Sequence, residues 1–154
     1  MRISWKTLLG SIAISLLVGG LAGFLTRNSM DVYQALEKPS ISPPGWIFPV
    51  VWTILYILMG ISAYIIYESQ DPNSEKALQL YGAQLVINFT WSIVFFLMQD
   101  YWLAFVVLVV LWVMILMMIL EFYRINKIAG LLQIPYLLWV TFAGYLNFMI
   151  ALSN

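Results

Sequence analysis

Five long stretches of this chain carry no charged residue, and each is long enough to cross a membrane as a helix. A transmembrane helix needs about 20 consecutive, mostly apolar residues. The uncharged stretches run from Thr7 to Thr26, from Pro39 to Tyr67, from Ala77 to Gln99, from Tyr101 to Leu120 and from Ile128 to Asn154. All seven basic and all seven acidic residues lie in the N-terminal segment or in the four connections. The sequence therefore predicts an all-α integral membrane protein, with one membrane domain over residues 1–154.

The expected architecture is a bundle of five transmembrane helices with a long, structured first connection. We place the spans at about 7–26, 44–67, 77–98, 101–123 and 128–151, and the first connection at 27–43. Only 9% of the residues are charged, against about 25% in a soluble domain. A cleaved signal peptide is the alternative for the first span, with Arg2 and Lys6 before it. Its apolar run is longer than the usual ~7–15 residues and lacks an A-x-A-like site, so a transmembrane helix is the preferred interpretation.

Orientation follows from the basic residues, which are enriched in cytoplasmic loops. The N-terminal segment and the second and fourth connections share one side, and they carry Arg2, Lys6, Lys76, Arg124 and Lys127. The opposite side carries only Arg27 and Lys38. We therefore expect a multi-pass membrane protein with a cytoplasmic N-terminus, and a resemblance described below implies the bacterial cell membrane.

The residue types that are missing narrow the chemistry. The chain contains no His and no Cys, which removes the usual ligands of zinc, haem iron and iron–sulfur clusters. All carboxylates lie in connections or at span ends, so no acid–base pair is expected at membrane depth. With zero net charge nothing points to nucleic acid. We expect no metal site and no cofactor.

Small residues recur on one face of the first span, at Ser11, Ser15, Gly19 and Gly23. Residues four apart share a helix face, and small side chains let a second helix approach closely. Packing inside the bundle is the simpler interpretation, and a homodimer interface is the alternative.

Several large aromatic and amide side chains lie inside the spans rather than at their ends. Counting about 1.5 Å per residue from the outer side puts Trp52, Trp91 and Ala143 about 10–12 Å deep, Asn88 about 15 Å and Trp139 about 18 Å. They come from three helices and lie below the first connection. A buried amide needs a partner in hydrocarbon, so Asn88 faces the bundle interior. Either it bonds a neighbouring helix, or these residues line a ligand cavity.

The first connection is built to be a stiff lid over this region. Pro39, Pro43 and Pro44 lower the entropy lost on ordering it, and Met30, Tyr33 and Leu36 recur every three residues, as in a short amphipathic helix. Ser42 and Pro43 would start the second span as N-cap and first-turn residue. Indole and phenyl walls without charge favour a flat, largely apolar ligand.

Three stretches, "EKPSISPPGWIFPVVWTILYILMG", "QLVINFTWSIVFF" and "IPYLLWVTFAGYLN", resemble the translocator protein family, also known as TspO/MBR or tryptophan-rich sensory proteins, in a bacterial-type form. The resemblance implies a five-helix bundle, commonly a homodimer, with a cavity that binds porphyrins such as protoporphyrin IX and drug-like aromatic molecules. By motif position it implies the following ligand-binding residues: Tyr33, Pro43, Ile47, Phe48, Trp52, Asn88, Trp91, Trp102, Phe105, Trp139, Ala143 and Leu146.

The leading functional prediction is a membrane receptor or sensor for a porphyrin-like tetrapyrrole. One alternative is a light- and oxygen-dependent enzyme that degrades protoporphyrin IX, for which the resemblance implicates Trp52 and Trp139. A porphyrin or sterol transporter is the second alternative, disfavoured because no coupling charge lies in the spans. Ile41 and Val106 depart from the family pattern, and no Lys or Arg follows Tyr145. Cholesterol transport is therefore not expected.

Overall fold

The structure is a computed structural model that describes residues 3–154. Arg2, which contributes to the expected charge asymmetry, lies outside the described residues, as does the side chain of Met30. The described elements are α1 (Trp5–Leu25), α2 (Met30–Ala35), α3 (Ile47–Glu68), α4 (Ser74–Ser92), the π-helical segment η1 (Ile93–Leu97), α5 (Tyr101–Ile125), α6 (Lys127–Leu131) and α7 (Ile134–Ser153). Five helical segments are long and apolar enough to span a membrane, with η1 continuing α4 and α6 preceding α7. The prediction of an all-α membrane protein is confirmed.

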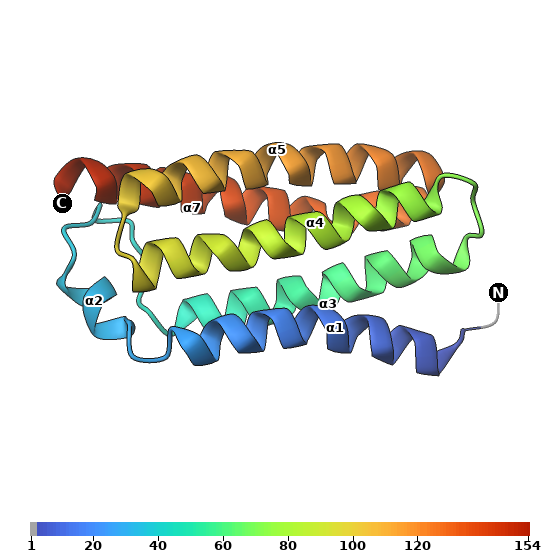
Figure 1. Cartoon of the computed structure of the whole chain (residues 1–154), viewed down its shortest axis with the longest axis horizontal. Coiled ribbons are helices and arrows are strands. Elements are labelled where there is room, and N and C mark those ends of the chain that lie inside the picture. Colours follow the sequence, from blue (N-terminus) through green and yellow to red (C-terminus); the bar gives the residue numbers. More distant parts are fainter. Residues whose placement is uncertain (1–2) are drawn as a thin grey trace.

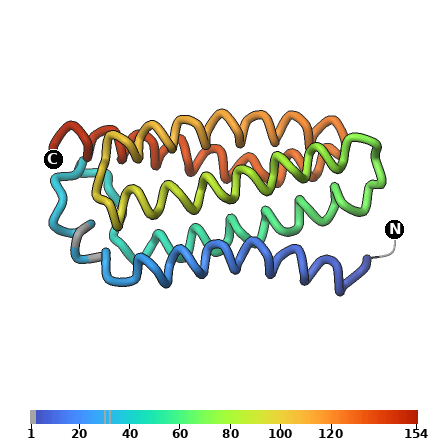
Figure 2. The backbone as a smooth tube through the Cα atoms, viewed as in Figure 1, coloured from blue at the N-terminus to red at the C-terminus, as the bar shows by residue number. Residues whose placement is uncertain are grey.

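The five long segments run side by side as one bundle (Figure 1). Helix α1 packs on α3, α4 packs on α5, and α5 packs on α7. The lid, which in the structure covers residues 26–46 and contains α2, lies at the same end of the bundle as the C-terminus (Figure 2). The other end holds the start of α1 and the α3–α4 connection (Figure 1).

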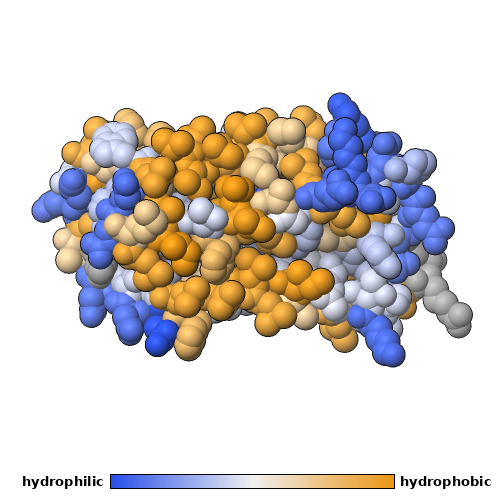
Figure 3. Space-filling view, in the orientation of Figure 1, coloured by the Kyte–Doolittle hydropathy of each residue, from blue (hydrophilic) through white to orange (hydrophobic). Residues whose placement is uncertain are grey.

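The surface has the pattern expected of a protein in a bilayer. Apolar side chains form a broad band across the middle of the molecule, and hydrophilic residues gather at both ends (Figure 3). Leu17 of α1 and Leu138 of α7 are 71% and 64% exposed, which is unfavourable in water and favourable in hydrocarbon. Trp5, Trp46 and Tyr67 are exposed near span ends, where aromatic side chains meet the headgroup region.

Small residues bring α1 against α3. The Ser11 hydroxyl donates to the Gly60 carbonyl at 2.7 Å, and the Ser15 hydroxyl donates to the Tyr56 carbonyl at 2.6 Å. Gly19 faces the Tyr56 ring so closely that even a methyl group would collide with it. Most of this face therefore packs inside the bundle, as in the simpler interpretation, whereas Gly23 has no neighbour among the described residues within 4 Å of the point where a side chain would begin.

Two helix starts differ from the sequence-based expectation. Helix α3 begins at Ile47 and not at Ser42 or Pro43, because a residue that precedes proline is pushed out of the helical region. Ser42 and Pro43 both precede a proline. The last span is also interrupted, since α6 ends at Leu131 and α7 begins at Ile134. Asn126 caps α6 by accepting hydrogen bonds from the amides of Ile128 and Ala129.

Candidate functional site: an aromatic cavity beneath the lid

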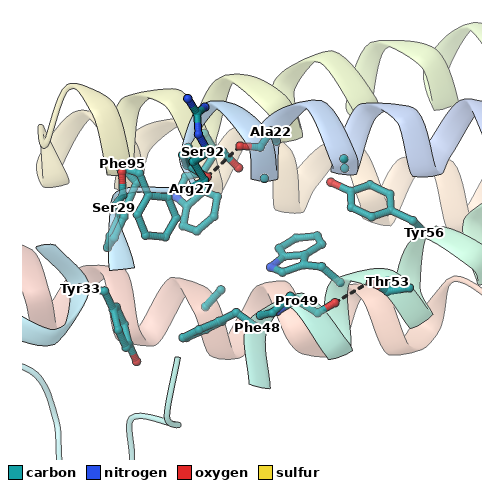
Figure 4. A pocket seen from close by; sticks show the side chains of 18 of the residues that line it. Ala22, Arg27, Ser29, Tyr33, Phe48, Pro49, Thr53, Tyr56, Ser92 and Phe95 are labelled. Atoms are coloured by element: carbon teal, nitrogen blue, oxygen red, sulfur yellow. Dashed lines mark hydrogen bonds between the residues drawn. The ribbon is translucent and has the colours of Figure 1, made fainter. Parts of the chain in front are cut away.

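A cavity of about 490 Å³ lies between the helices at the lid end of the bundle. Its walls come from α1, α3, α4, η1 and α7, and its end is lined by four lid residues, Thr26, Arg27, Ser29 and Tyr33. Figure 4 shows Tyr33 at one end and Tyr56 at the other, with Phe48 and Pro49 of α3 between them. The volume falls within the ~300–1,000 Å³ that is typical of small-molecule sites.

Paired aromatic rings form much of the wall. The Trp52 and Tyr56 ring centroids are 5.6 Å apart on α3, and those of Trp91 and Phe95 are 5.3 Å apart where α4 continues into η1. None of the described residues that line the cavity is acidic, and the one basic lining residue among them is Arg27. Uncharged aromatic faces favour flat, largely apolar ligands over ions or sugars.

The lid is held in place by polar contacts around Tyr33. The Tyr33 side chain is 4% exposed and its ring packs edge-on against Phe48, with centroids 5.1 Å apart. Its hydroxyl donates to the Pro43 carbonyl at 2.9 Å. Burial raises the pKa of Tyr33 above its ordinary value, so the hydroxyl keeps the proton that it donates.

Two further contacts fix the chain around α2. The Lys38 ammonium donates to the carbonyls of Tyr33, Gln34 and Leu36, at and just beyond the end of α2, where helix carbonyls lack partners of their own. The side-chain amide of Asn154 forms two hydrogen bonds with the backbone of Glu37, which ties the lid to the end of α7. The lid is thus a braced cover, in agreement with the stiffness expected from its prolines.

A chain of buried hydrogen bonds supports the floor of the cavity. The Tyr56 hydroxyl donates to Oδ1 of Asn88 at 3.2 Å, and Nδ2 of Asn88 donates to the Tyr136 hydroxyl at 2.7 Å. That hydroxyl in turn donates to Oε1 of Gln84 at 2.7 Å. Asn88, Tyr136 and Gln84 are each no more than 1% exposed. The network joins α3, α4 and α7 below the cavity.

Removal of the Tyr136 hydroxyl should destabilise the bundle. In Tyr136→Phe, two fully buried amide side chains each lose a partner, and we expect the free energy of unfolding to fall by about 1–2 kcal/mol. Thermal unfolding in detergent measures the effect. Tyr145→Phe is the matched control, because Tyr145 lies on the same helix with its side chain 45% exposed. Equal losses in the two variants would contradict the role assigned to the network.

Another amide positions an indole in the wall. Nε1 of Trp91 donates to Oδ1 of Asn147 at 3.0 Å, while Nδ2 of Asn147 donates to the Tyr101 carbonyl at 2.9 Å. Trp91 is thereby fixed in position, and Asn147 itself lines the cavity. Asn147 was not among the residues expected to bind ligand.

Half of the residues expected to bind ligand line the cavity: Tyr33, Phe48, Trp52, Trp91, Ala143 and Leu146. Pro43 lies in the lid and supplies the carbonyl that Tyr33 bonds. Ile47 is the half-buried first residue of α3. Trp139 lies behind Phe48, with ring centroids 5.8 Å apart, and its buried indole N–H has no hydrogen-bond partner within the described part of the chain.

Three of the expected residues do not line the cavity. Asn88 lies under the floor of the cavity, and its side-chain amide is hydrogen-bonded to the Tyr56 and Tyr136 hydroxyls. Trp102 and Phe105 pack against Phe148 on the outer surface, with centroid distances of 5.9 and 5.3 Å. Helix α5 turns Ala104, Leu108 and Leu111 to the core, and this rotation carries Trp102 and Phe105 outward. Phe105 lines a separate outer groove of about 210 Å³ between α5 and α7.

Sequence reasoning missed the wall contributed by α1. Gly19, Gly20, Ala22 and Gly23 line the cavity, but such residues carry no side chain whose chemistry signals a ligand. Their only sequence signal was the spacing of small residues, which equally indicates helix packing.

The chain matches known proteins over nearly its whole length. The model of the TspO/MBR family matches residues 11–152. The tryptophan-rich protein TspO of Chlorobaculum tepidum is 42% identical over 88% of this chain and 88% of its own length. The tryptophan-rich sensory protein of Cereibacter sphaeroides is 40% identical over 75% of this chain and 72% of its own. The translocator protein of Sus scrofa is 34% identical over 90% of this chain and 86% of its own.

Proposed function

The chain belongs to the TspO/MBR family, and on that premise we propose that it is a membrane receptor for a porphyrin-like ligand. The ligand is a flat, largely apolar aromatic molecule that binds inside the bundle. The observation that carries the proposal is the aromatic cavity of about 490 Å³ beneath the lid. The name of the Cereibacter sphaeroides relative, a sensory protein, favours a sensor role over a purely structural one.

The cavity supports this ligand class through its shape and its chemistry. Trp52 and Trp91 present indole rings from different helices, and offset or edge-on contacts with such rings contribute about 0.5–1.5 kcal/mol each beyond area burial. Two hydroxyl groups in the wall are already engaged, since Thr26 donates to the Ala22 carbonyl and Thr53 donates to the Pro49 carbonyl. The chain has no His or Cys for axial ligation, so stacking and shape would hold a tetrapyrrole.

Quenching of tryptophan fluorescence by protoporphyrin IX tests the proposal. The protein in lipid nanodiscs should show saturable quenching with one ligand per chain. In Trp52→Leu we expect the Kd to rise about tenfold, because the loss of one stacked indole removes about 1.4 kcal/mol. Trp5→Leu is the matched control, since Trp5 is 63% exposed at the far end of α1. Non-saturable quenching, or equal Kd values in the two variants, would argue against the cavity as the site.

A further inference from the structure

The residues that expose the cavity lie mostly along its sides. Of the four lid residues in its wall, Ser29 and Tyr33 are buried at 6% and 4% exposure, Thr26 is half-buried and Arg27 is exposed. The other exposed lining residues lie within two membrane spans. They are Gly20 and Gly23 on α1, and Pro49 and Thr53 on α3.

These four residues lie where α1 and α3 separate. Nearer the middle of the bundle the helices touch, and a side chain on Gly60 would lie 2.5 Å from Cα of Ile12. The contact extends to Gly19, which faces the Tyr56 ring, but one turn nearer the lid Gly23 has no described atom of another element within 4 Å of where a side chain would begin. Pro49, Thr53, Tyr56 and Gly60 lie on one face of α3, because they follow one another at intervals of three or four residues. Tyr56 and Gly60 are buried against α1, whereas Pro49 and Thr53, which lie nearer the lid, are exposed.

The gap between α1 and α3 lies at the depth of the bilayer and has an apolar rim. Gly23 lies two residues before the end of α1 and Thr53 six residues after the start of α3, which is about 3 and 9 Å from the helix ends. The Thr53 hydroxyl donates to the Pro49 carbonyl at 2.7 Å. The rim therefore presents glycine backbone, a proline ring and a threonine methyl group, which suit a lipid neighbour better than water.

From this geometry we infer that the ligand reaches the cavity sideways from the bilayer, through the gap between Gly23 and Thr53. The inference rests on the proposed function and narrows it to ligands that dissolve in the membrane. The lid then acts as a fixed roof, which agrees with the hydrogen bond between Tyr33 and Pro43 within it and with those that join its Glu37 to Asn154. Water-soluble aromatic molecules of the same size are excluded from this route.

A bulky residue in the gap should slow both binding and release. In Gly23→Leu we expect the association and dissociation rate constants for protoporphyrin IX each to fall by about tenfold, measured by stopped-flow quenching in nanodiscs. The dissociation rate constant is the decisive readout, because Gly23 also lines the cavity and a new side chain there can weaken the Kd, whereas slower release requires a barrier in the route. Gly10→Leu is the matched control, since Gly10 is an exposed glycine of α1 with equally open surroundings but does not line the cavity.

Thr53→Phe narrows the same gap from the α3 side. The same rate constants are measured on this variant, so the test does not depend on the folding of Gly23→Leu. Unchanged rates in a folded variant would overturn the route. So would a weaker Kd with an unchanged dissociation rate, because the new side chain would then occupy the cavity itself. Absence of saturable binding in the unaltered protein would be a different result, since it would refute the proposed function and the route together.

Discussion

Replacement of Ala143 by phenylalanine is expected to weaken protoporphyrin IX binding by about 100-fold, equivalent to about 2.7 kcal/mol. Ala143 is 7% exposed and lies in the α7 wall of the cavity. A phenyl ring at this position projects into the space that the ligand needs. The cavity has space for the phenyl ring, so the melting temperature of the protein should change little even though ligand binding is much weaker. Titration of tryptophan fluorescence in nanodiscs measures the affinity.

The matched control is Ala83→Phe, because Ala83 is exposed on α4 and absent from the cavity wall. It adds the same ring to the lipid-facing surface, and its Kd should equal that of the unaltered protein. If a folded Ala143→Phe protein binds protoporphyrin IX as tightly as Ala83→Phe does, the ligand does not occupy the cavity.

Replacement of Gly60 by valine should cause the largest loss of stability. Already the first side-chain carbon at this position would lie 2.5 Å from Cα and 2.9 Å from the amide nitrogen of Ile12. These are backbone atoms and cannot rotate away, so α1 has to move off α3. The move also strains the bond from the Ser11 hydroxyl to the Gly60 carbonyl. We expect a loss of about 3 kcal/mol or more, measured as a lower midpoint of thermal unfolding in detergent.

Gly82→Val provides the comparison, because Gly82 lies inside α4 with no neighbour within 4 Å of a new side chain. Its stability should change by less than about 1 kcal/mol, since helix propensity is the main term affected. Similar midpoints for Gly60→Val and Gly82→Val would show that α1 and α3 do not meet as described.

Much of the fold was predictable because a bilayer allows few arrangements of charge. Glu68, Lys76, Asp100 and Lys127 all had to lie near water, so the uncharged stretches between them had to be the spans. The inward face of α4 was predictable for the same reason. Gln84 and Asn88 would be unpaired in lipid, and both are buried. The helix starts were less predictable, since the effect of Pro44 on Pro43 outweighed the capping tendency of Ser42.

The cavity wall was predictable only where large side chains signalled it. Trp52 and Trp91 are too deep for the interfacial aromatic belt, so an inward role was the natural expectation. The face that α5 turns to the core could not be deduced, because that helix is apolar on nearly every side. The sequence therefore did not show that Trp102 and Phe105 pack on Phe148, away from the cavity. The glycine wall of α1 carries no chemical signal at all.

A structure of the protein with protoporphyrin IX bound tests the central claim most directly. We predict the macrocycle between Trp52 and Trp91, against Ala143 and beneath Tyr33, with its edge at the gap beside Gly23. A macrocycle seated instead in the outer groove between α5 and α7, against Phe105, with the cavity beneath the lid left empty, would contradict the claim.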